Sequence, residues 1–246
     1  METKNNYNLI PTYRNSFGTG WQVMKENFLR LFLVVIVLAV VASPFKMMDF
    51  KINPSDLEGP WEWAGDWEKL IGWGALGMLA GFFGMIAVLY ALLVAPVFKF
   101  GGDLIFVHAV RQIKPDFELL IKGFSGNYLF IILANLLVFA LVILGLFALI
   151  IPGIIIACRL VFVTYIVMDK KVDPIEAVEM SWKLTRGHGW KIFFMGFTSF
   201  FIIILGLCMV IVGVFPAIIW VASSFASLYQ SVLLEKEKPV EETAVV

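Results

Sequence analysis

Long apolar runs alternate with short polar segments along most of the chain. A helix needs about 20 mostly apolar residues to cross a bilayer, because its backbone N–H and C=O groups find no water in the hydrocarbon. The pattern therefore predicts an all-α fold, a polytopic transmembrane helical bundle with about six spans. The predicted spans are Phe28–Phe45, Leu70–Val110, Tyr128–Ile151, Pro152–Met168, Trp190–Val212 and Pro216–Leu234.

The second run, Leu70–Val110, is too long for a single crossing. As one helix it would reach roughly 60 Å, about twice the thickness of the hydrocarbon. Part of it must therefore project from the bilayer, or the helix must break. Lys99, Asp103 and the pair Gly101–Gly102 interrupt the run, and glycine leaves helical geometry most readily. We predict the break at Gly101–Gly102.

The composition supports a membrane location. Hydrophobic residues make up 60% of the chain and charged residues 15%, whereas soluble domains carry about 25% charged residues. Lys+Arg and Asp+Glu are equal at 19 each, so no basic excess points to nucleic acid. Cys158 and Cys208 lie inside apolar runs and are typical of small buried hydrophobes, not of a disulfide framework or a metal site.

The distribution of basic residues predicts the orientation in the membrane, because Lys and Arg concentrate in cytoplasmic segments. Most of them fall before the first predicted span, in 99–126, in 169–191 or at the end of the chain, whereas the opposite side carries few. We expect both termini in the cytoplasm. The expected organisation is a cytoplasmic tail at 1–15, one transmembrane domain at 16–234, and a second cytoplasmic tail at 235–246.

Three prolines each precede a polar residue by seven positions, which suggests an internal repeat. Proline fits the first turn of a helix, where its missing N–H leaves no bond unmade. We predict a unit of one interfacial helix and one helical hairpin, used about three times in the same direction. Chance similarity among apolar segments is the alternative. The pairs are Pro96 with Asp103, Pro152 with Arg159 and Pro216 with Ser223, and the predicted interfacial stretches are Pro115–Gly126 and Pro174–Gly189.

The second of these stretches carries signals for a helix start. Asp173 is placed to cap the helix, Pro174 suits the first helical position, and Glu176 has the spacing of a capping box. One face of the predicted helix is apolar, so we expect it to lie in the headgroup region of the membrane. The residues of this face are Ile175, Val178 and Trp182.

Arg159 lies near the middle of a predicted span, where an ionised side chain costs at least about 2.5 kcal/mol. Asp103 has the opposite charge and the equivalent place in the repeat, so we predict an intramembrane polar pair of Arg159 and Asp103. The pair would either join two helices or contact a lipid headgroup or an ion path.

A stripe of glycines at helical spacing runs along the second predicted span. Because glycine lets another helix approach closely, we predict helix packing along this stripe, within the chain or at a dimer interface. Its members are Gly74, Gly77, Gly81 and Gly84.

Catalytic motifs do not stand out in the sequence. His108 and His188 fall far apart at predicted membrane boundaries, and we find no metalloprotease helix, nucleophile elbow or phosphate-binding loop. We expect neither an enzyme nor a bound cofactor or metal.

Several motifs between residues 150 and 191 carry a family resemblance: Ile151-Pro152-Gly153, Arg159, Glu176-Ala177, Ser181-Trp182-Lys183-Leu184-Thr185 and Gly187-His188-Gly189-Trp190. With these motifs the chain resembles a broad group of poorly characterised bacterial six-helix membrane proteins. The group includes the membrane domain fused to some glycerophosphodiester phosphodiesterases. The resemblance implies a helical bundle in the inner membrane and carries over no catalytic residue.

Together these patterns favour a non-catalytic membrane protein that acts as a scaffold for lipid or for a partner. Membrane lipids, a membrane protein or a second copy of the chain are the expected partners, and nucleic acid is not. The alternative is a small-solute transporter or permease that uses Arg159 and Asp103 as its polar site.

Overall fold

The structure is a computed structural model that describes residues 7, 9–42, 67–126, 128–209 and 213–243. Side-chain surroundings within these segments are described except at 67–77, 79–80 and 238–243. This part of the chain contains helices and turns and no strand, which confirms the predicted all-α class. The elements are α1 (Tyr13–Ala42), α2 (Trp67–Leu93), α3 (Ala95–Val110), α4 (Glu118–Lys122), the short 3-10 helix η3 (Gly123–Ser125), α5 (Tyr128–Ala148), α6 (Ile150–Leu160), α7 (Val163–Lys170), α8 (Pro174–Thr185), α9 (Gly189–Cys208) and α10 (Val214–Thr243).

Five stretches of the described chain are long and apolar enough to cross a membrane, so the bundle is polytopic. The first predicted span, Phe28–Phe45, is not among them, and its last residues lie outside the described part. Within α1 the longest segment free of charged residues runs from Leu31 to Ala42, which is short for a crossing. The five stretches are Gly81–Val110, Tyr128–Ala148, Ile150–Lys170, Gly189–Cys208 and Val214–Glu237.

The long second run breaks at Val94, between α2 and α3, and not at Gly101–Gly102 as predicted. Pro96 explains the position, because proline lacks an N–H and clashes with the carbonyl of the preceding turn. The two glycines lie inside α3 and are buried. A Cβ on Gly101 would come within 2.5 Å of the Leu119 carbonyl oxygen, so glycine here allows close packing and not a bend.

The predicted hairpin units are present. Pro96, Pro152 and Pro216 each lie in the first turn of a helix, α3, α6 and α10 respectively. The pairs α5–α6 and α9–α10 pack against each other as hairpins, with α4 and α8 before them in the chain. In the first unit the equivalent entry is a kink in α1, where Asn27 departs from helical geometry with φ −117°.

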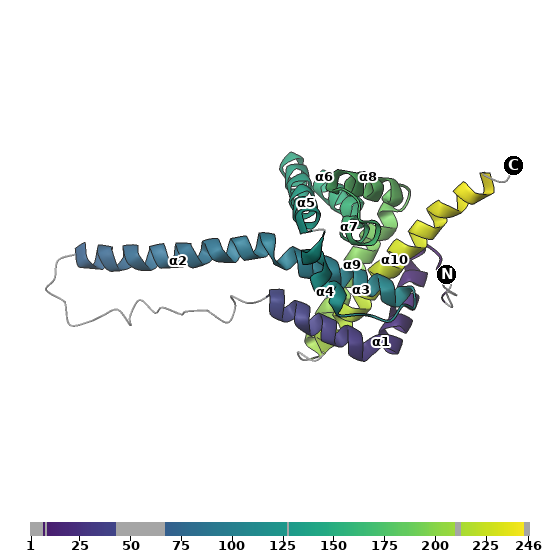
Figure 1. Ribbon diagram of the computed structural model, residues 1–246, viewed down its shortest axis with the longest axis horizontal. Helices are drawn as coiled ribbons and strands as arrows, with labels where there is room; N and C mark the ends of the chain where they lie inside the picture. The colour runs from purple at the N-terminus through teal and green to yellow at the C-terminus, as the bar shows by residue number, and fades with distance from the viewer. Residues whose placement is uncertain (1–6, 8, 43–66, 127, 210–212, 244–246) are drawn as a thin grey trace.

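The core forms where α1 crosses α10, the most extensive helix contact of the described chain (Figure 1). Gly20 permits this approach, since a Cβ there would lie 2.2 Å from the hydroxyl oxygen of Ser224. The Trp220 indole N–H donates to the Phe17 carbonyl at 3.0 Å and fixes the crossing. Small serines on α10 therefore serve as packing residues, much as alanine does in tightly packed helix pairs.

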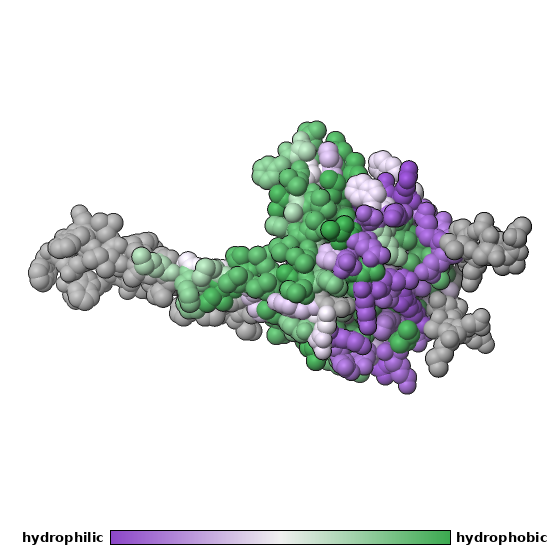
Figure 2. Space-filling model, turned by 45° about the horizontal axis from the view of Figure 1, so that its top comes forward, coloured by the Kyte–Doolittle hydropathy of each residue, from purple (hydrophilic) through white to green (hydrophobic). Residues whose placement is uncertain are grey.

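The surface divides into an apolar and a hydrophilic part. Figure 2 shows hydrophobic residues over α2 and the adjoining side of the bundle, with hydrophilic residues gathered at the opposite end. Met78 and Phe82 on α2 are 80% and 54% exposed, which a lipid-facing helix tolerates and a water-facing one does not.

Both predicted tails are partly helical. The first helix begins at Tyr13, and α10 continues past residue 234 to Thr243. The ion pair Lys170–Glu237, at 3.1 Å, and the contact of the His188 Nε2 with the Glu235 carboxylate, at 3.2 Å, join the first turn of this extension to the bundle.

Candidate functional site

A cluster of four polar side chains joins three helices at one end of the bundle. The Arg111 guanidinium donates to both carboxylate oxygens of Asp169, at 2.5 and 2.7 Å. Its Nε donates to the amide oxygen of Gln230 at 2.7 Å, and the Tyr229 hydroxyl donates to Asp169 at 2.9 Å. We call these four residues the Arg111 cluster. It ties the ends of α3 and α7 to the middle of α10.

Local chain geometry delivers these side chains to the same place. Arg111 is the C-cap of α3 and is followed by Gln112 with φ 59°, while Lys171 ends α7 with φ 53°. A left-handed residue terminates a helix and leaves the last side chains of that helix facing the turn. Two neighbouring helices that end in this way bring Arg111 and Asp169 together.

The electrostatics of the cluster hold Arg111 in its charged form. Burial works against the guanidinium, but the hydrogen bonds and the charge of Asp169 outweigh it. The pKa of Arg111 therefore lies above its ordinary value. A planar fork that meets both oxygens of a carboxylate is the strongest ion-pair geometry available to a protein.

A cavity of about 350 Å³ lies beside the Arg111 cluster, between the ends of α3, α4 and α7. We call it the lysine cavity. Its lining combines apolar, hydroxyl and basic residues, and Asp169 is its one acidic member. The lining residues are Leu104, His108, Leu119, Lys122, Ser125, Gly126, Met168, Asp169 and Lys171.

The two lysines of this cavity differ from the neighbouring Lys170. Lys170 pairs with Glu237 at 3.1 Å, whereas Lys122 and Lys171 make no hydrogen bond or ion pair with any residue of the described chain. Since Asp169 is already held by Arg111, the cavity carries positive charge without a matching anion. Such a lining can receive an anionic group.

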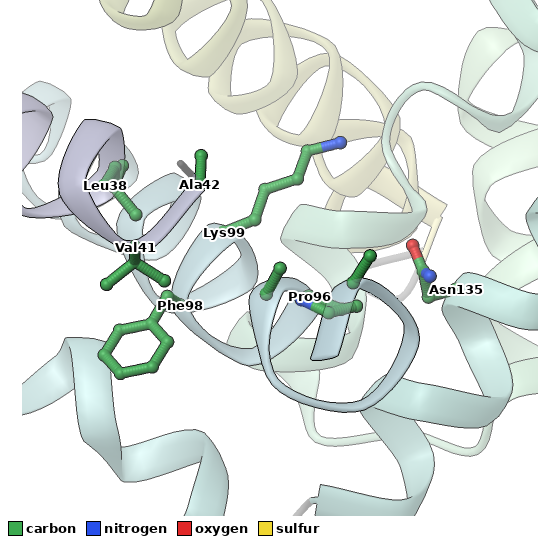
Figure 3. A pocket seen from close by; sticks show the side chains of 9 residues that line it. Leu38, Val41, Ala42, Pro96, Phe98, Lys99 and Asn135 are labelled. Carbon is green, nitrogen blue, oxygen red and sulfur yellow. The ribbon is translucent and has the colours of Figure 1, made fainter. Parts of the chain in front are cut away.

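A second cavity of about 290 Å³ lies between the end of α1, the α2–α3 junction and α5 (Figure 3). Figure 3 shows the Lys99 side chain reaching along it, with the Asn135 amide on the far side. The remaining lining is apolar and includes Leu38, Val41 and Phe98. With one cation and one amide in a hydrocarbon wall, this cavity offers fewer partners to an anionic group than the lysine cavity does.

The predicted pair of Asp103 and Arg159 is not formed. The ion pairs of the described chain do not include it, and the electrostatic neighbours of Asp103 are Lys99, Thr164 and Tyr165. Both residues lie seven positions after a proline, so they occupy the same place in their own repeat units. Whether two such residues touch depends on how the units pack against each other, which the repeat pattern does not specify.

Arg159 instead interacts with α8. Its guanidinium lies over the Trp182 ring, 5.6 Å from the centroid, and its Nη1 is buried with no hydrogen-bond partner in the described chain. Its carbonyl, at the junction of α6 and α7, accepts from the Ser181 hydroxyl at 2.7 Å; the Thr185 hydroxyl lies 3.3 Å from the same carbonyl and closer, at 2.8 Å, to the Ser181 carbonyl. The motif from Ser181 to Thr185 therefore holds a break between two helices.

Helix α8 exposes two residues of its predicted apolar face, but its predicted capping box does not form. Pro174 is its first residue after the N-cap Asp173, yet the Asp173 side chain makes no cap hydrogen bond, so the predicted capping box does not form. Ile175 and Trp182 are 69% and 45% exposed on the predicted apolar face. The opposite face, with Ala177 and Ser181, packs against the bundle.

Two members of the predicted glycine stripe on α2, Gly81 and Gly84, make no close packing contact with the described part of the chain, since a Cβ on either would meet none of its atoms within 4 Å. The surroundings of Gly74 and Gly77 lie outside the described part. Close packing occurs at other glycines. Gly145 and Gly153 let α5 and α6 touch, since a Cβ on Gly145 would lie 3.0 Å from the Gly153 Cα.

Sequence reasoning missed the Arg111 cluster and the lysine cavity. The repeat was one available signal. Arg111 directly follows α3, the helix that contains Pro96, and Asp169 lies at the end of α7, which follows the Pro152 helix α6. The described residues hold no group of three His, Cys, Asp or Glu side chains that could bind a metal ion. Comparison with protein-family descriptions, curated proteins and solved structures finds no match for this chain.

Proposed function

We propose that this chain is a non-catalytic membrane protein that binds a membrane lipid in the lysine cavity and acts as a scaffold in the bilayer. The observation that carries the proposal is the mixed lining of that cavity. Leu104, Leu119 and Met168 line it together with Lys122 and Lys171, which have no anionic partner in the described chain. A site that combines apolar and cationic residues matches an amphiphile.

The bilayer we propose is the bacterial inner membrane, with both termini in the cytoplasm. The distribution of Lys and Arg along the sequence supports this orientation. With the proposed orientation, the lysine cavity lies at the cytoplasmic surface, where anionic headgroups attract basic side chains. The resemblance to six-helix bacterial membrane proteins agrees with it, and we propose membership in that group.

The proposal is tested by native mass spectrometry of the protein extracted gently from its own membrane. Gly126 lines the cavity, and an added Cβ there meets nothing within 4 Å, so Gly126→Trp places a large side chain at the cavity without a backbone clash at its Cβ. Gly81→Trp is the matched control, because Gly81 is equally open and lies on α2, which contributes no residue to the cavity.

We expect the wild-type protein and Gly81→Trp to retain lipid, and Gly126→Trp to lose most of it. Extraction of a protein without lipid, or equal retention by both variants, contradicts the proposal. Thermal unfolding of each variant in the same detergent checks that the substituted proteins are folded.

Transport of a small solute is a second candidate, and the unpartnered Nη1 of Arg159 favours it. A buried guanidinium nitrogen without a partner is costly unless water or a solute reaches it. The test is a cysteine at Ile155, one turn before Arg159, in a chain without Cys158 and Cys208. Reaction with a membrane-impermeant thiol reagent supports a path, whereas protection supports a packed scaffold.

A further inference from the structure

We infer that the lysine cavity selects an anionic phospholipid and holds its phosphate between Lys122 and Lys171. This inference rests on the proposed function, because it names the class of lipid that the cavity binds. It adds a specific chemistry, the recognition of negative charge. A lipid scaffold that binds any headgroup would not need this property.

The charge balance of the cavity is the first argument. Asp169 is its one acidic side chain, and it accepts two hydrogen bonds from Arg111 and one from Tyr229. Its charge is therefore compensated within the protein. Lys122 and Lys171 keep theirs, so a zwitterionic headgroup leaves both positive charges of the lining uncompensated, whereas a singly anionic one compensates one of them.

The arrangement of donors is the second argument. Lys122, Ser125 and Gly126 come from α4, η3 and the turn after it, and Lys171 and His108 come from the ends of α7 and α3. Four separate elements thus bring N–H and O–H donors to one cavity. Phosphate oxygens accept several such bonds at once, so these donors hold the phosphate of a phospholipid, while the charge of the lining sets the preference between an anionic and a zwitterionic headgroup.

The apolar wall decides between a lipid and a free phosphate. Leu104, Leu119 and Met168 are 6%, 7% and 6% exposed and line the cavity beside the lysines. A soluble phosphate would gain nothing from this surface, whereas the glycerol backbone and the first methylenes of a phospholipid would cover it.

The test is a competition in nanodiscs that contain equal amounts of phosphatidylglycerol and phosphatidylcholine, with bound lipid counted by native mass spectrometry. We expect the wild-type protein to favour phosphatidylglycerol roughly thirtyfold, the effect of two lysines near an anionic headgroup. In the double variant Lys122→Gln/Lys171→Gln the preference should fall to about twofold or less, while lipid itself stays bound.

The control Lys183→Gln/Lys236→Gln removes the same charge from two exposed lysines that do not line the cavity, and it should keep the wild-type preference. Equal binding of the two lipids by the wild-type protein overturns the inference, as does an unchanged preference in the cavity variant. Displacement of the lipid by millimolar inorganic phosphate overturns the assignment to a lipid. A wild-type protein that retains lipid without any headgroup preference fails the inference alone and leaves the proposed function standing, so the two failures are distinct.

Discussion

The Arg111 guanidinium donates two hydrogen bonds to the Asp169 carboxylate, at 2.5 and 2.7 Å, and so joins the ends of α3 and α7. The Asp169 side chain is 8% exposed, and Tyr229 and Gln230 complete the contacts from α10. Three helices that are distant in sequence are thereby fixed around one carboxylate. This contact also forms one wall of the lysine cavity.

Removing the charge of Asp169 should destabilise the bundle strongly. We expect Asp169→Asn to lower the free energy of unfolding by about 3 kcal/mol, because it leaves the Arg111 charge partly buried without its partner. Unfolding in mixed detergent micelles measures the change. The exposed pair Glu179–Lys183, at 3.6 Å, provides the comparison, and Glu179→Gln should cost no more than about 0.5 kcal/mol. Similar effects of the two substitutions would contradict the structural role of the cluster.

Gly101 should tolerate no side chain. A Cβ there would lie 2.5 Å from the Leu119 carbonyl oxygen and 2.8 Å from the Leu120 Cα, so α4 must move away from α3. We expect Gly101→Ala to lower the free energy of unfolding by about 1–3 kcal/mol, as overpacked cores do. The same substitution at Gly81, where an added Cβ meets nothing within 4 Å, should cause no loss. Thermal melts of both variants decide the matter.

The hydroxyl of Ser181 should matter for the break between α6 and α7. It donates to the Arg159 carbonyl at 2.7 Å, and Ser181→Ala leaves near that carbonyl only the Thr185 hydroxyl, 3.3 Å away and closer, at 2.8 Å, to the Ser181 carbonyl. We expect a loss of about 1 kcal/mol, the usual contribution of one such hydrogen bond. The Ser181→Ala/Thr185→Ala double variant should lose more than either single one. A double variant as stable as the wild type would refute the role we assign to this motif.

The exposed face of α8 should lie in the membrane interface. A spin label at Ile175, in a chain without Cys158 and Cys208, should collide more with oxygen than with a water-soluble nickel reagent, because the headgroup region excludes the latter. A label at Glu176 on the neighbouring exposed position should show the reverse preference. Two labels with the same water-like accessibility would place α8 in solution.

High pH should weaken the attachment of the first described residues. Burial, and then the hydrogen bond to Glu26, raise the pKa of Tyr7 to about 12. The folded state therefore holds the phenol proton more tightly than the unfolded state does. Its contribution to stability is complete below pH 10 and is lost as the pH rises toward 12. An absorbance titration at about 295 nm, compared with Tyr7→Phe, isolates this group, and an ordinary pKa would contradict the prediction.

The class of the fold was predictable because it follows from one physical constraint. A chain with apolar runs such as Tyr128–Ala148 can satisfy its backbone in a bilayer only as helices. The prolines were also reliable signals of helix starts, since Pro96, Pro152 and Pro216 all lie in the first turn of a helix. The glycines were not reliable signals, because glycine is compatible both with a bend and with close helix packing. Gly101 permits packing in the structure, and Gly81 meets no neighbour within the chain.

The sequence by itself determined that the protein is built for a membrane, that its fold is helical and that it contains hairpin units. Hydropathy and the helix-starting effect of proline are both local properties of the chain, so they can be read without the tertiary structure. Only the tertiary structure decided which polar groups meet. Asp103 and Arg159 have equivalent places in the repeat, yet they do not pair, whereas Arg111 and Asp169 do. The reason is that ion pairs form over a few ångströms between helices, and the rotation and depth of each helix come from the packing of glycines and serines across the bundle. The lysine cavity has the same origin, since it exists only where the ends of α3, α4 and α7 converge.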